Sequence, residues 1–258
     1  AYDVALEDKR NLEQAETVFE VQNLSCKNLF HDISFSAKRG EIIGFGGLVG
    51  AGRSELMEAI FGFVPATEGK IIVKGLEVKI HHPNDAVKAG FGMVPEERKE
   101  KGIFPGLSVM NNINVVSYAK LKHGKLIIKK LESASADEYV NKLSIRTTNL
   151  RKLVGQLSGG NQQKCVVSRW LRMNPDVLIL DEPTHGIDIG AKEDIYRIIR
   201  ELAQKGVTIL LISSEMPELI RLSDRIVVMC EGQQKAILNK NEISQDTIMR
   251  HAMRQVPN

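Results

Sequence analysis

The chain alternates short apolar runs with segments of helical spacing along most of its length. Eight runs have the length and apolar content of strands, at residues 18–24, 32–38, 41–47, 70–75, 91–96, 177–182, 207–213 and 225–232. The run from Val177 to Leu180 contains no polar residue, which is typical of strands buried on both faces of a parallel sheet. Strands that alternate with helices predict an α/β fold with a largely parallel central sheet.

The alternation stops between Pro105 and Leu157. This stretch has no strong strand pattern, and residues 108–121 and 133–145 have the spacing of helices. We therefore expect a helical subdomain at about residues 103–157. Residues 1–17 are polar with mixed charge, which predicts a linker before a single domain at residues 18–258. A chain that starts in this way, without methionine, is expected to be a piece of a longer protein.

Composition narrows the function classes only slightly. A net charge of +3 from 35 basic and 32 acidic residues predicts no binding of nucleic acid. The three cysteines lie far apart without a C-x-x-C pair, which argues against a zinc site and a disulfide framework. Since no apolar run approaches the roughly 18 residues that span a bilayer, any membrane role is expected to come through a partner.

A glycine-rich segment, GGLVGAGRSEL, follows the apolar run at 41–47. It matches the P-loop pattern G-x-x-x-x-G-K-[ST] except that Arg53 replaces the lysine. Such a turn directs backbone N–H groups and a helix end at one point, which favours phosphate. Arginine keeps the charge, but its longer planar group cannot simply occupy the place of the ammonium. The candidate nucleotide-binding residues here are Gly47, Gly50, Ala51, Gly52, Arg53, Ser54 and Glu55.

Two adjacent carboxylates, Asp181 and Glu182, end the apolar run that starts at Val177. Asp181 can hold Mg²⁺ through water together with the Ser54 hydroxyl, and Glu182 can polarise an attacking water. A strand that merely ends in a solvated acidic pair is the alternative, and it becomes weaker beside a P-loop.

A third segment, QLSGGNQQKCVVSRWL, places Ser158, Gly159 and Gly160 before a helical pattern. A helix start with open N–H groups and a hydroxyl is a second anion site. For the trio taken alone, a capping serine followed by spacer glycines is the better explanation. The order and spacing of all three motifs favour a phosphate site.

With GAGRSEL, LSGGNQQK and LDEPTHGIDIGAK, the chain resembles the nucleotide-binding cassette of ABC transporters from about Val18 to Met253. The likeness is to the second, C-terminal cassette of the double-cassette ATPases of bacterial sugar importers, such as those for ribose, galactose or xylose. It implies a P-loop ABC-type fold with a mainly parallel core sheet, an antiparallel β subdomain and an α-helical subdomain. It also implies ATP and Mg²⁺ as cofactors and Asp188 as the D-loop residue. The signature motif would be Leu157, Ser158, Gly159, Gly160, Asn161 and Gln162.

The resemblance also implies partners. In such cassettes two units pair head to tail, so the signature motif of one closes over nucleotide held by the P-loop of the other. We therefore expect a second cassette on the same polypeptide and a membrane permease that docks near Glu96 and the helical subdomain. A sugar-binding protein would act indirectly, and the expected location is peripheral, on the cytoplasmic face of the cell membrane.

Several positions depart from the family pattern. Glu96, a further candidate nucleotide-binding residue, stands where a glutamine is usual, and Ser214 stands where a switch histidine is usual. No aromatic residue upstream suits adenine stacking. Serine cannot carry a proton near neutrality as imidazole does. With Glu182, Asp181 and Ser214 as catalytic candidates, we expect a degenerate second cassette that is weakly active or inactive alone. The alternatives are a soluble ABC ATPase of translation or DNA repair and a non-hydrolysing nucleotide-binding regulatory module.

Overall fold

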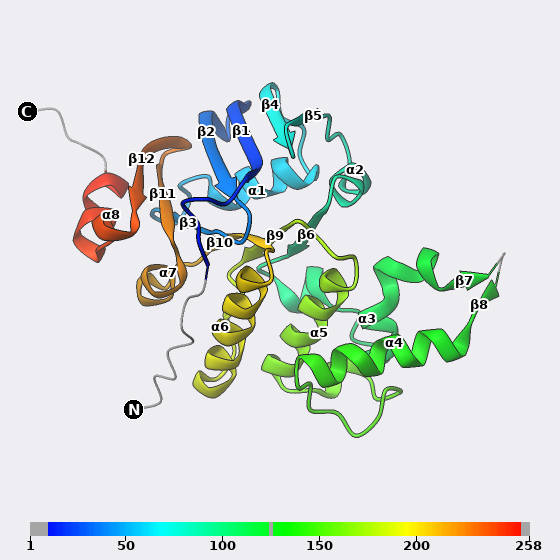
Figure 1. Ribbon diagram of the computed structural model, residues 1–258. Helices are drawn as coiled ribbons and strands as arrows, with labels where there is room; N and C mark the ends of the chain where they lie inside the picture. Colours follow the sequence, from blue (N-terminus) through cyan, green and yellow to red (C-terminus); the bar gives the residue numbers. More distant parts are fainter. Residues whose placement is uncertain (1–9, 124–125, 254–258) are drawn as a thin grey trace, which may run out of the picture. The chain divides into compact units, whose positions relative to one another are not determined.

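The computed structural model describes residues 10–123 and 126–253, so part of the predicted linker, residues 1–9, lies outside the described residues (Figure 1). The chain divides into two compact units. The first unit comprises Ala1–Phe91, Asp176–Asp181 and Ile199–Asn258. The second unit comprises Gly92–Pro175 and Glu182–Ile198.

The core of the first unit is a parallel sheet. Its strands are β3 (Ile42–Gly46), β9 (Val177–Asp181), β10 (Thr208–Ile212) and β11 (Arg225–Cys230). Strand β10 pairs in parallel with both β3 and β9, and β11 pairs in parallel with β3. Every residue of β3, β9 and β10 is buried, as expected for strands covered on both faces. The predicted parallel core is confirmed.

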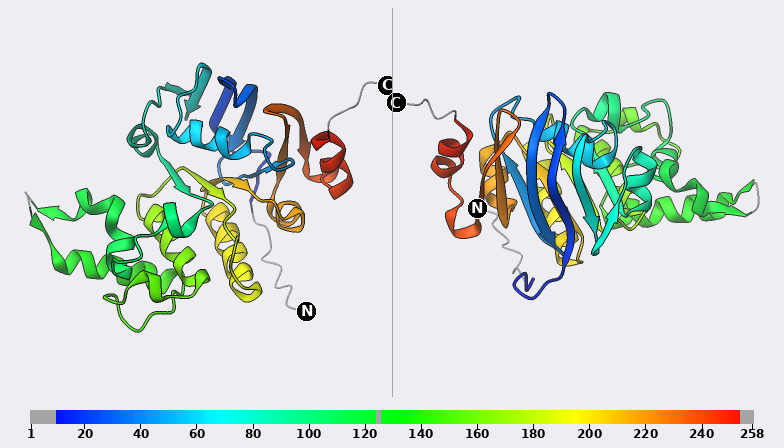
Figure 2. Two further views of the ribbon diagram at one scale, coloured as in Figure 1. Left: turned by 180° about the vertical axis from the view of Figure 1, so that it is seen from behind. Right: turned by 90° about the horizontal axis from the view of Figure 1, so that it is seen from above.

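An antiparallel region extends this sheet. It contains β1 (Thr17–Cys26), β2 (Phe30–Lys38), β4 (Glu68–Val73) and β5 (Leu76–Val78), while β12 (Gln233–Asn239) pairs with both β11 and β2. The strand order is β5-β4-β1-β2-β12-β11-β3-β10-β9, and Figure 2 shows β1, β2 and β4 side by side. Neither β5 nor β12 was predicted, because both are short of buried apolar residues.

Aromatic side chains join the antiparallel region to the parallel core. The ring of Phe35 on β2 lies 5.6 Å from that of Phe19 on β1 and 5.2 Å from that of Phe45 on β3. Both contacts are edge-to-face, the arrangement that the ring quadrupole favours. Because Phe19 and Phe45 are fully buried, these rings form a continuous apolar layer within the first unit.

Helices complete the first unit. They are α1 (Arg53–Phe61), α2 (Pro83–Lys88), α7 (Met216–Leu222) and α8 (Gln245–Ala252). Helix α7 contacts β3, and α8 contacts β11 and β12. A further helix, α6 (Ile189–Gln204), begins in the second unit and ends in the first.

The second unit is mainly helical. After β6 (Phe91–Val94) and a π-helical turn at Arg98–Gly102, it contains α3 (Val109–Asn114), α4 (Lys129–Lys142) and α5 (Gly159–Leu171). The helix predicted at 108–121 is α3 followed by a 3-10 segment, and α4 begins before the predicted residue 133. Shortly after α4, Ser144 has a left-handed φ of 50°, which is incompatible with a continuing helix.

This stretch, which has no strong strand pattern, contains one small strand pair. Two short strands, β7 (Lys122–His123) and β8 (Leu126–Ile127), form an antiparallel pair. Two residues per strand are too few to produce an alternating pattern in the sequence. The pair therefore adds a short antiparallel ladder to a mainly helical unit.

A buried arginine fastens α5 to its neighbours in the second unit. The Arg169 guanidinium donates to the carbonyl oxygens of Asn112 and Gly102 at 2.8 and 2.7 Å and lies 5.5 Å from the Phe104 ring. Burial lowers the pKa of Arg169 to about 10. The same helix carries Cys165, whose pKa burial raises to about 12 despite the nearby charge of Arg169. All three cysteines of the chain are buried and unpaired.

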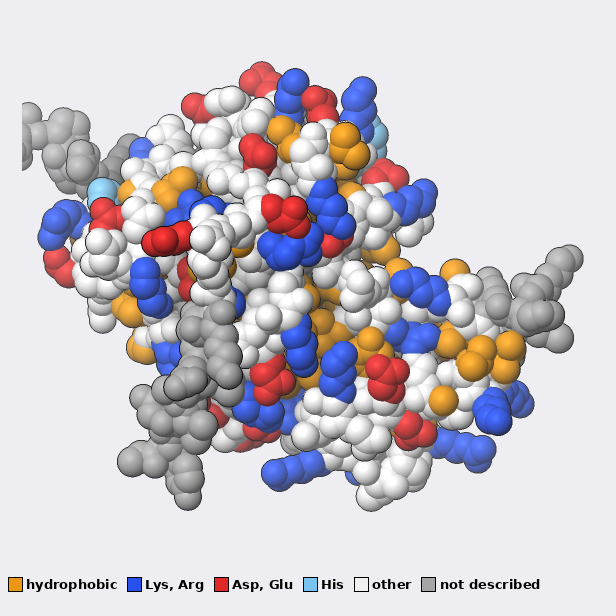
Figure 3. Space-filling view, in the orientation of Figure 1, with side chains coloured by type: hydrophobic (Ala, Val, Ile, Leu, Met, Phe, Trp, Pro, Cys, Tyr) orange, Lys and Arg blue, Asp and Glu red, His pale blue; other side chains and the backbone are white. Residues whose placement is uncertain are grey.

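On the face that Figure 3 shows and among the described helices, neither the distribution of surface charge nor the length of the helices indicates a charged binding surface or a membrane span. Basic and acidic side chains are interspersed over the face that Figure 3 shows, rather than gathered by sign. Within the described ranges, no helix is both long and apolar enough to cross a membrane.

Residues that were predicted to belong to the linker are fastened to the first unit. Arg10 donates two hydrogen bonds to the carboxylate of Asp224, at 2.7 and 2.9 Å, and a third to the carbonyl of Gly40. The same carboxylate accepts from the backbone N–H of Ile42 at the start of β3. Because Arg10 and Asp224 are only 12% and 15% exposed, this bidentate pair is protected from solvent and stronger than a surface ion pair.

We expect Arg10→Ala to lower the free energy of unfolding by about 1–3 kcal/mol, since it leaves a partly buried carboxylate without its cation. Urea denaturation followed by circular dichroism measures this. Arg250→Ala is the control, because the Arg250–Asp246 pair is 69% and 83% exposed and should contribute less than about 0.5 kcal/mol. Equal unfolding midpoints for the two variants would contradict the prediction.

Candidate functional site

The predicted P-loop is a left-handed turn that leads into α1. Gly50 and Gly52 have φ of 78° and 93°, values that other residues rarely adopt. A side chain at Gly52 would also come within 3.2 Å of the Leu29 carbonyl oxygen. Helix α1 starts at Arg53, and among the described residues no side chain caps its first turn. The first N–H groups of α1 are therefore available to an anion.

Ser54 and Asp181 meet at the end of the parallel strands. Ser54 Oγ donates to Asp181 Oδ1 at 3.3 Å, and Asp181 is only 4% exposed. Mg²⁺ prefers oxygen ligands and is usually held by one or two protein groups together with phosphate oxygens and water. A hydroxyl and a carboxylate this close fit that role. The described residues contain no group of three or more His, Cys, Asp or Glu side chains that could hold a metal.

Arg53 points to the end of β10. Its side chain is buried, and Nη1 donates to the backbone carbonyl of Ser213 at 3.2 Å. Ser213 in turn donates its hydroxyl to Oε2 of the buried Glu218 at 2.9 Å and accepts from the backbone N–H of Glu215. The sequence pointed to Ser214 at this place, but Ser214 is exposed and the contact with Arg53 is made by Ser213.

Glu182, which follows Asp181 in the chain, has a left-handed backbone. Its φ is 47°, and its carbonyl accepts from the N–H of His185 at 3.1 Å. A non-glycine residue in this region is strained by the order of 1–3 kcal/mol, and such strain is concentrated at functional sites. Seven other described non-glycine residues share this conformation, so the backbone alone assigns Glu182 no role.

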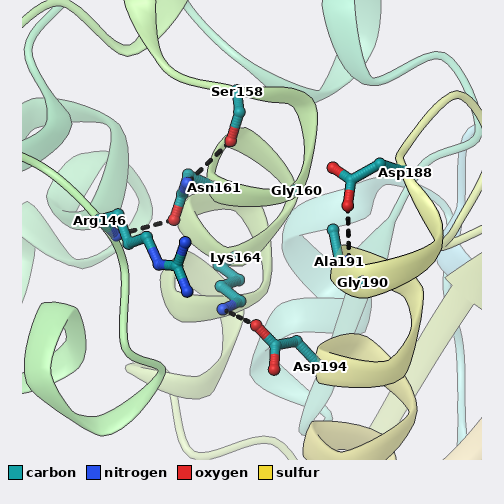
Figure 4. A pocket seen from close by; sticks show the side chains of 9 residues that line it. All are labelled: Arg146, Ser158, Gly160, Asn161, Lys164, Asp188, Gly190, Ala191 and Asp194. Atoms are coloured by element: carbon teal, nitrogen blue, oxygen red, sulfur yellow. Dashed lines mark hydrogen bonds and ion pairs between the residues drawn. The ribbon is translucent and has the colours of Figure 1, made fainter.

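The signature segment borders a cavity of about 240 Å³ in the second unit (Figure 4). One wall is the start of α5 and the other is the start of α6, with Asp188 immediately before that helix. The lining residues are Arg146, Ser158, Gly160, Asn161, Lys164, Asp188, Gly190, Ala191 and Asp194. The structure thus brings the predicted signature residues Ser158, Gly160 and Asn161 together with the predicted D-loop residue Asp188.

The start of α5 is open to a ligand. Ser158 occupies the N-cap position, but its side chain makes no capping hydrogen bond within the described chain. Its hydroxyl oxygen instead accepts from Asn161 Nδ2 at 2.8 Å. A Cβ atom at Gly160 would lie 2.4 Å from the Cβ of Ala191, so only glycine allows α5 and α6 to approach this closely. The uncapped first turn leaves N–H groups for an anion.

Gln162, also predicted as a signature residue, faces inward. Its Nε2 donates to the Leu157 carbonyl at 3.0 Å, and its Oε1 accepts from Arg98 Nε at 3.3 Å. Arg98 also donates to the carbonyl of His185 at 3.3 Å. Burial lowers the pKa of this guanidinium. The Gln162 side chain therefore makes hydrogen bonds inside the protein, and Arg98 connects Gln162 to the loop after Glu182.

Sequence reasoning missed three polar residues of the cavity, which are Arg146, Lys164 and Asp194. Lys164 was detectable, because residues 158, 161 and 164 are spaced by three and share one helix face. Arg146 and Asp194 come from other segments, and no local spacing indicates them. Glu96 is exposed on the same unit and does not line the cavity.

Lys164 and Asp194 form an ion pair across the cavity wall. Lys164 Nζ lies 2.7 Å from Asp194 Oδ2, and the side chains are 5% and 40% exposed. Burial alone raises the pKa of Asp194, but the hydrogen bonds and positive charges of Lys164 and Arg197 outweigh it, so the pKa lies below its ordinary value. The pair holds α5 and α6 together beside Ser158.

Comparisons with known proteins agree with this geometry. A family model described as "ABC transporter" matches residues 30–185. The ribose import ATP-binding protein RbsA of Shouchella clausii is 44% identical over 242 residues, covering 94% of this chain and 48% of that protein. The galactose/methyl galactoside import ATP-binding protein MglA of Clostridium tetani is 47% identical over 242 residues, covering 93% and 48%. The chain spans about half the length of the curated relatives it matches.

Solved structures confirm the predicted fold class. A nucleotide-free ATP-binding cassette from an ABC transporter superposes with a TM-score of 0.79 at 21% identity, covering 93% of this chain and 100% of that one. The ADP conformation of a second ATP-binding cassette, MJ1267, gives 0.76 at 22% identity, covering 92% and 98%. The expected cassette, with a mainly parallel core, an antiparallel region and a helical subdomain, is confirmed.

We expect Asp194→Asn to lower the free energy of unfolding at pH 7 by about 1 kcal/mol. The loss arises because the buried Lys164 keeps its charge without the opposing carboxylate. It is small because Asp194 is partly exposed, so solvent screens the ion pair. A carboxylate with a lowered folded-state pKa stabilises above its unfolded pKa of about 4. That stabilisation is lost as the pH falls through the folded-state pKa. The deficit of the variant should therefore shrink in denaturation curves taken between pH 7 and pH 3.

Asp246→Asn is the matched control, since it removes one carboxylate from the exposed Arg250–Asp246 pair. It should change stability little at any pH. An Asp194→Asn deficit that is equal at pH 7 and pH 3 would show that the charge of Asp194 does not stabilise this wall.

Proposed function

The chain belongs to the ABC transporter family, and on that premise we propose that it is one ATP-binding half of a motor that drives import of a monosaccharide. Curated relatives are named for ribose and for galactose/methyl galactoside import. The chain spans 48% of their length, which supports a second cassette on the same polypeptide. In this proposal the motor is peripheral, on the cytoplasmic face of the membrane.

The cavity at the start of α5 carries this proposal. One chain offers two uncapped helix starts with a serine beside each, Ser54 at α1 and Ser158 at α5. In the proposal, each of these two helix starts contacts a different nucleotide. We propose that two cassettes pair head to tail, and that Ser158 and the N–H groups after it close over the terminal phosphate of ATP bound to the partner.

The site around this chain's own P-loop has a separate role in the proposal. Ser54 and Asp181 would hold Mg²⁺, which neutralises charge on the transferring phosphoryl group. Glu182 would polarise the attacking water. Since the Arg53 guanidinium donates to Ser213 instead of extending as a lysine would, we propose that this site binds ATP but hydrolyses it slowly.

A membrane permease completes the proposed assembly. Glu96 is exposed, and in the same unit Phe104 and Leu107 remain 47% and 41% exposed. Apolar side chains rimmed by polar ones are typical of protein contact sites. We propose that a cytosolic helix of the permease docks near Glu96 and the helical subdomain, and that a sugar-binding protein acts through the permease. Nucleic acid has no part in the proposal.

The contact between Arg53 and Ser213 also favours a second candidate, a module that binds nucleotide for regulation and hydrolyses none. A soluble ABC ATPase is the remaining alternative, and the assays below distinguish all three.

We expect the isolated chain to bind Mg·ATP but to release phosphate slowly, because Arg53, Glu96 and Ser214 replace the usual lysine, glutamine and histidine. Steady-state phosphate release is measured beside nucleotide affinity, with Glu182→Gln as the reference for background. Turnover of the order of 1 s⁻¹ or faster that Glu182→Gln abolishes would contradict the slow site. Binding without any hydrolysis, alone or in the assembled complex, would favour the regulatory module.

We expect Ser158→Arg to stop sugar uptake by the complete transporter, because a bulky cation then fills the place of the partner's phosphate. Nucleotide affinity of this chain's own P-loop should remain within about twofold. Leu76→Arg is the control, since it adds the same cation at a side chain 71% exposed on β5. Uptake at the parental rate by the Ser158→Arg complex would rule out the proposed closure. Full ATP hydrolysis without any permease would instead favour a soluble ATPase.

A further inference from the structure

The side-chain amide of Asn161 joins Ser158 to the loop between α4 and α5 (Figure 4). Asn161 Oδ1 accepts from the backbone N–H of Arg146 at 2.7 Å, and Asn161 Nδ2 donates to Ser158 Oγ at 2.8 Å. All three residues line the cavity at the start of α5. Asn161 therefore connects the signature hydroxyl to a residue from another segment.

The chemistry of the partners decides which way this amide points. A backbone N–H is always a donor, so the atom of Asn161 that faces Arg146 has to be the oxygen. The amide nitrogen then faces Ser158. An amide nitrogen has only hydrogens to offer, so the Ser158 oxygen has to accept.

This bond determines where the Ser158 proton can go. A hydroxyl that accepts from Asn161 keeps one donor of its own. Within the part of the chain that the structure describes, the Ser158 side chain makes no other hydrogen bond. Since Ser158 lines the cavity, its proton is free to be donated to a ligand there.

We propose that Asn161 is a positioning residue that holds the Ser158 hydroxyl as a donor toward a phosphate oxygen, and the proposal rests on the head-to-tail pairing proposed above. Accepting a hydrogen bond also polarises a hydroxyl and strengthens the bond that it donates. In this assignment Asn161 acts through Ser158 and makes no contact with the nucleotide itself. The backbone of Arg146 fixes the amide, so the loop after α4 takes part in orienting the signature motif.

The test measures kcat and KM for ATP hydrolysis by the complete two-cassette polypeptide. Ser158→Ala removes the hydroxyl, and we expect kcat to fall about 10-fold or more with a smaller change in KM, as for loss of a donor to a transition-state oxygen. Asn161→Asp keeps the acceptor for Arg146 but cannot donate to Ser158. The hydroxyl then donates to the new carboxylate, so kcat should fall almost as far as in Ser158→Ala.

Asn161→Ala separates positioning from simple structural support. It loses both hydrogen bonds, so it should be less stable than Asn161→Asp in thermal unfolding. Its Ser158 hydroxyl nevertheless remains free to donate, so its kcat should exceed that of Asn161→Asp. A purely structural role predicts the same order for stability and for kcat, whereas positioning predicts opposite orders.

A double-mutant cycle removes the effect of the added charge. Repulsion between a carboxylate and phosphate would lower kcat equally with and without the Ser158 hydroxyl. We expect Asn161→Asp to lower kcat about 10-fold in the parent but less than about twofold in Ser158→Ala. Asn149→Asp is the matched control, because the exposed Asn149 Oδ1 also accepts from a backbone N–H, that of Arg151, and its kcat should match the parent.

The outcomes distinguish the two proposals. If Ser158→Ala hydrolyses ATP at the parental rate, the pairing and the positioning role are both overturned. If Ser158→Ala is impaired but Asn161→Asp behaves like Asn149→Asp, or lowers kcat equally in both backgrounds, the pairing stands and the role of Asn161 is overturned.

Discussion

One buried guanidinium holds the second unit together where its functional segments meet. Arg98 follows β6, and it donates to Gln162 on the signature helix and to the carbonyl of His185 in the loop after Glu182. Burying an unpaired cation is costly, and the desolvation that lowers the pKa of Arg98 reflects this. The hydrogen bonds offset that cost only while all three segments stay in place. A shift of any one segment would break at least one of these hydrogen bonds and leave the buried cation less compensated.

Polar side chains at both helix starts are likewise held by hydrogen bonds to neighbouring residues. At α5, Asn161 occupies the Ser158 oxygen and leaves its proton available. At α1, the Arg53 guanidinium donates one hydrogen bond to the Ser213 carbonyl. In the proposed function, the first arrangement prepares a donor, whereas the second holds the Arg53 side chain toward the end of β10.

Much of the fold was predictable because burial on two faces dictates apolar runs. Strands β3, β9 and β10 lie within a residue or two of their predicted bounds for that reason. Strand β12 was missed, since its partly exposed residues mix polar and apolar types. The motifs predicted Ser158, which lines the cavity, and Asp181, which accepts from Ser54. The inward orientation of Gln162, by contrast, involves a hydrogen bond from Arg98, 64 residues away. Contacts across such distances leave no local spacing in a sequence.

The burial of the three cysteines has a practical consequence. The thiolate is the form that attacks thiol-directed reagents. Burial shields Cys165 and raises its pKa to about 12, while Cys26 and Cys230 are only 5% and 6% exposed. The native chain can therefore serve unaltered as the background for a single introduced surface cysteine. Fluorophores or crosslinkers of defined length attached there would report distances within the proposed two-cassette assembly.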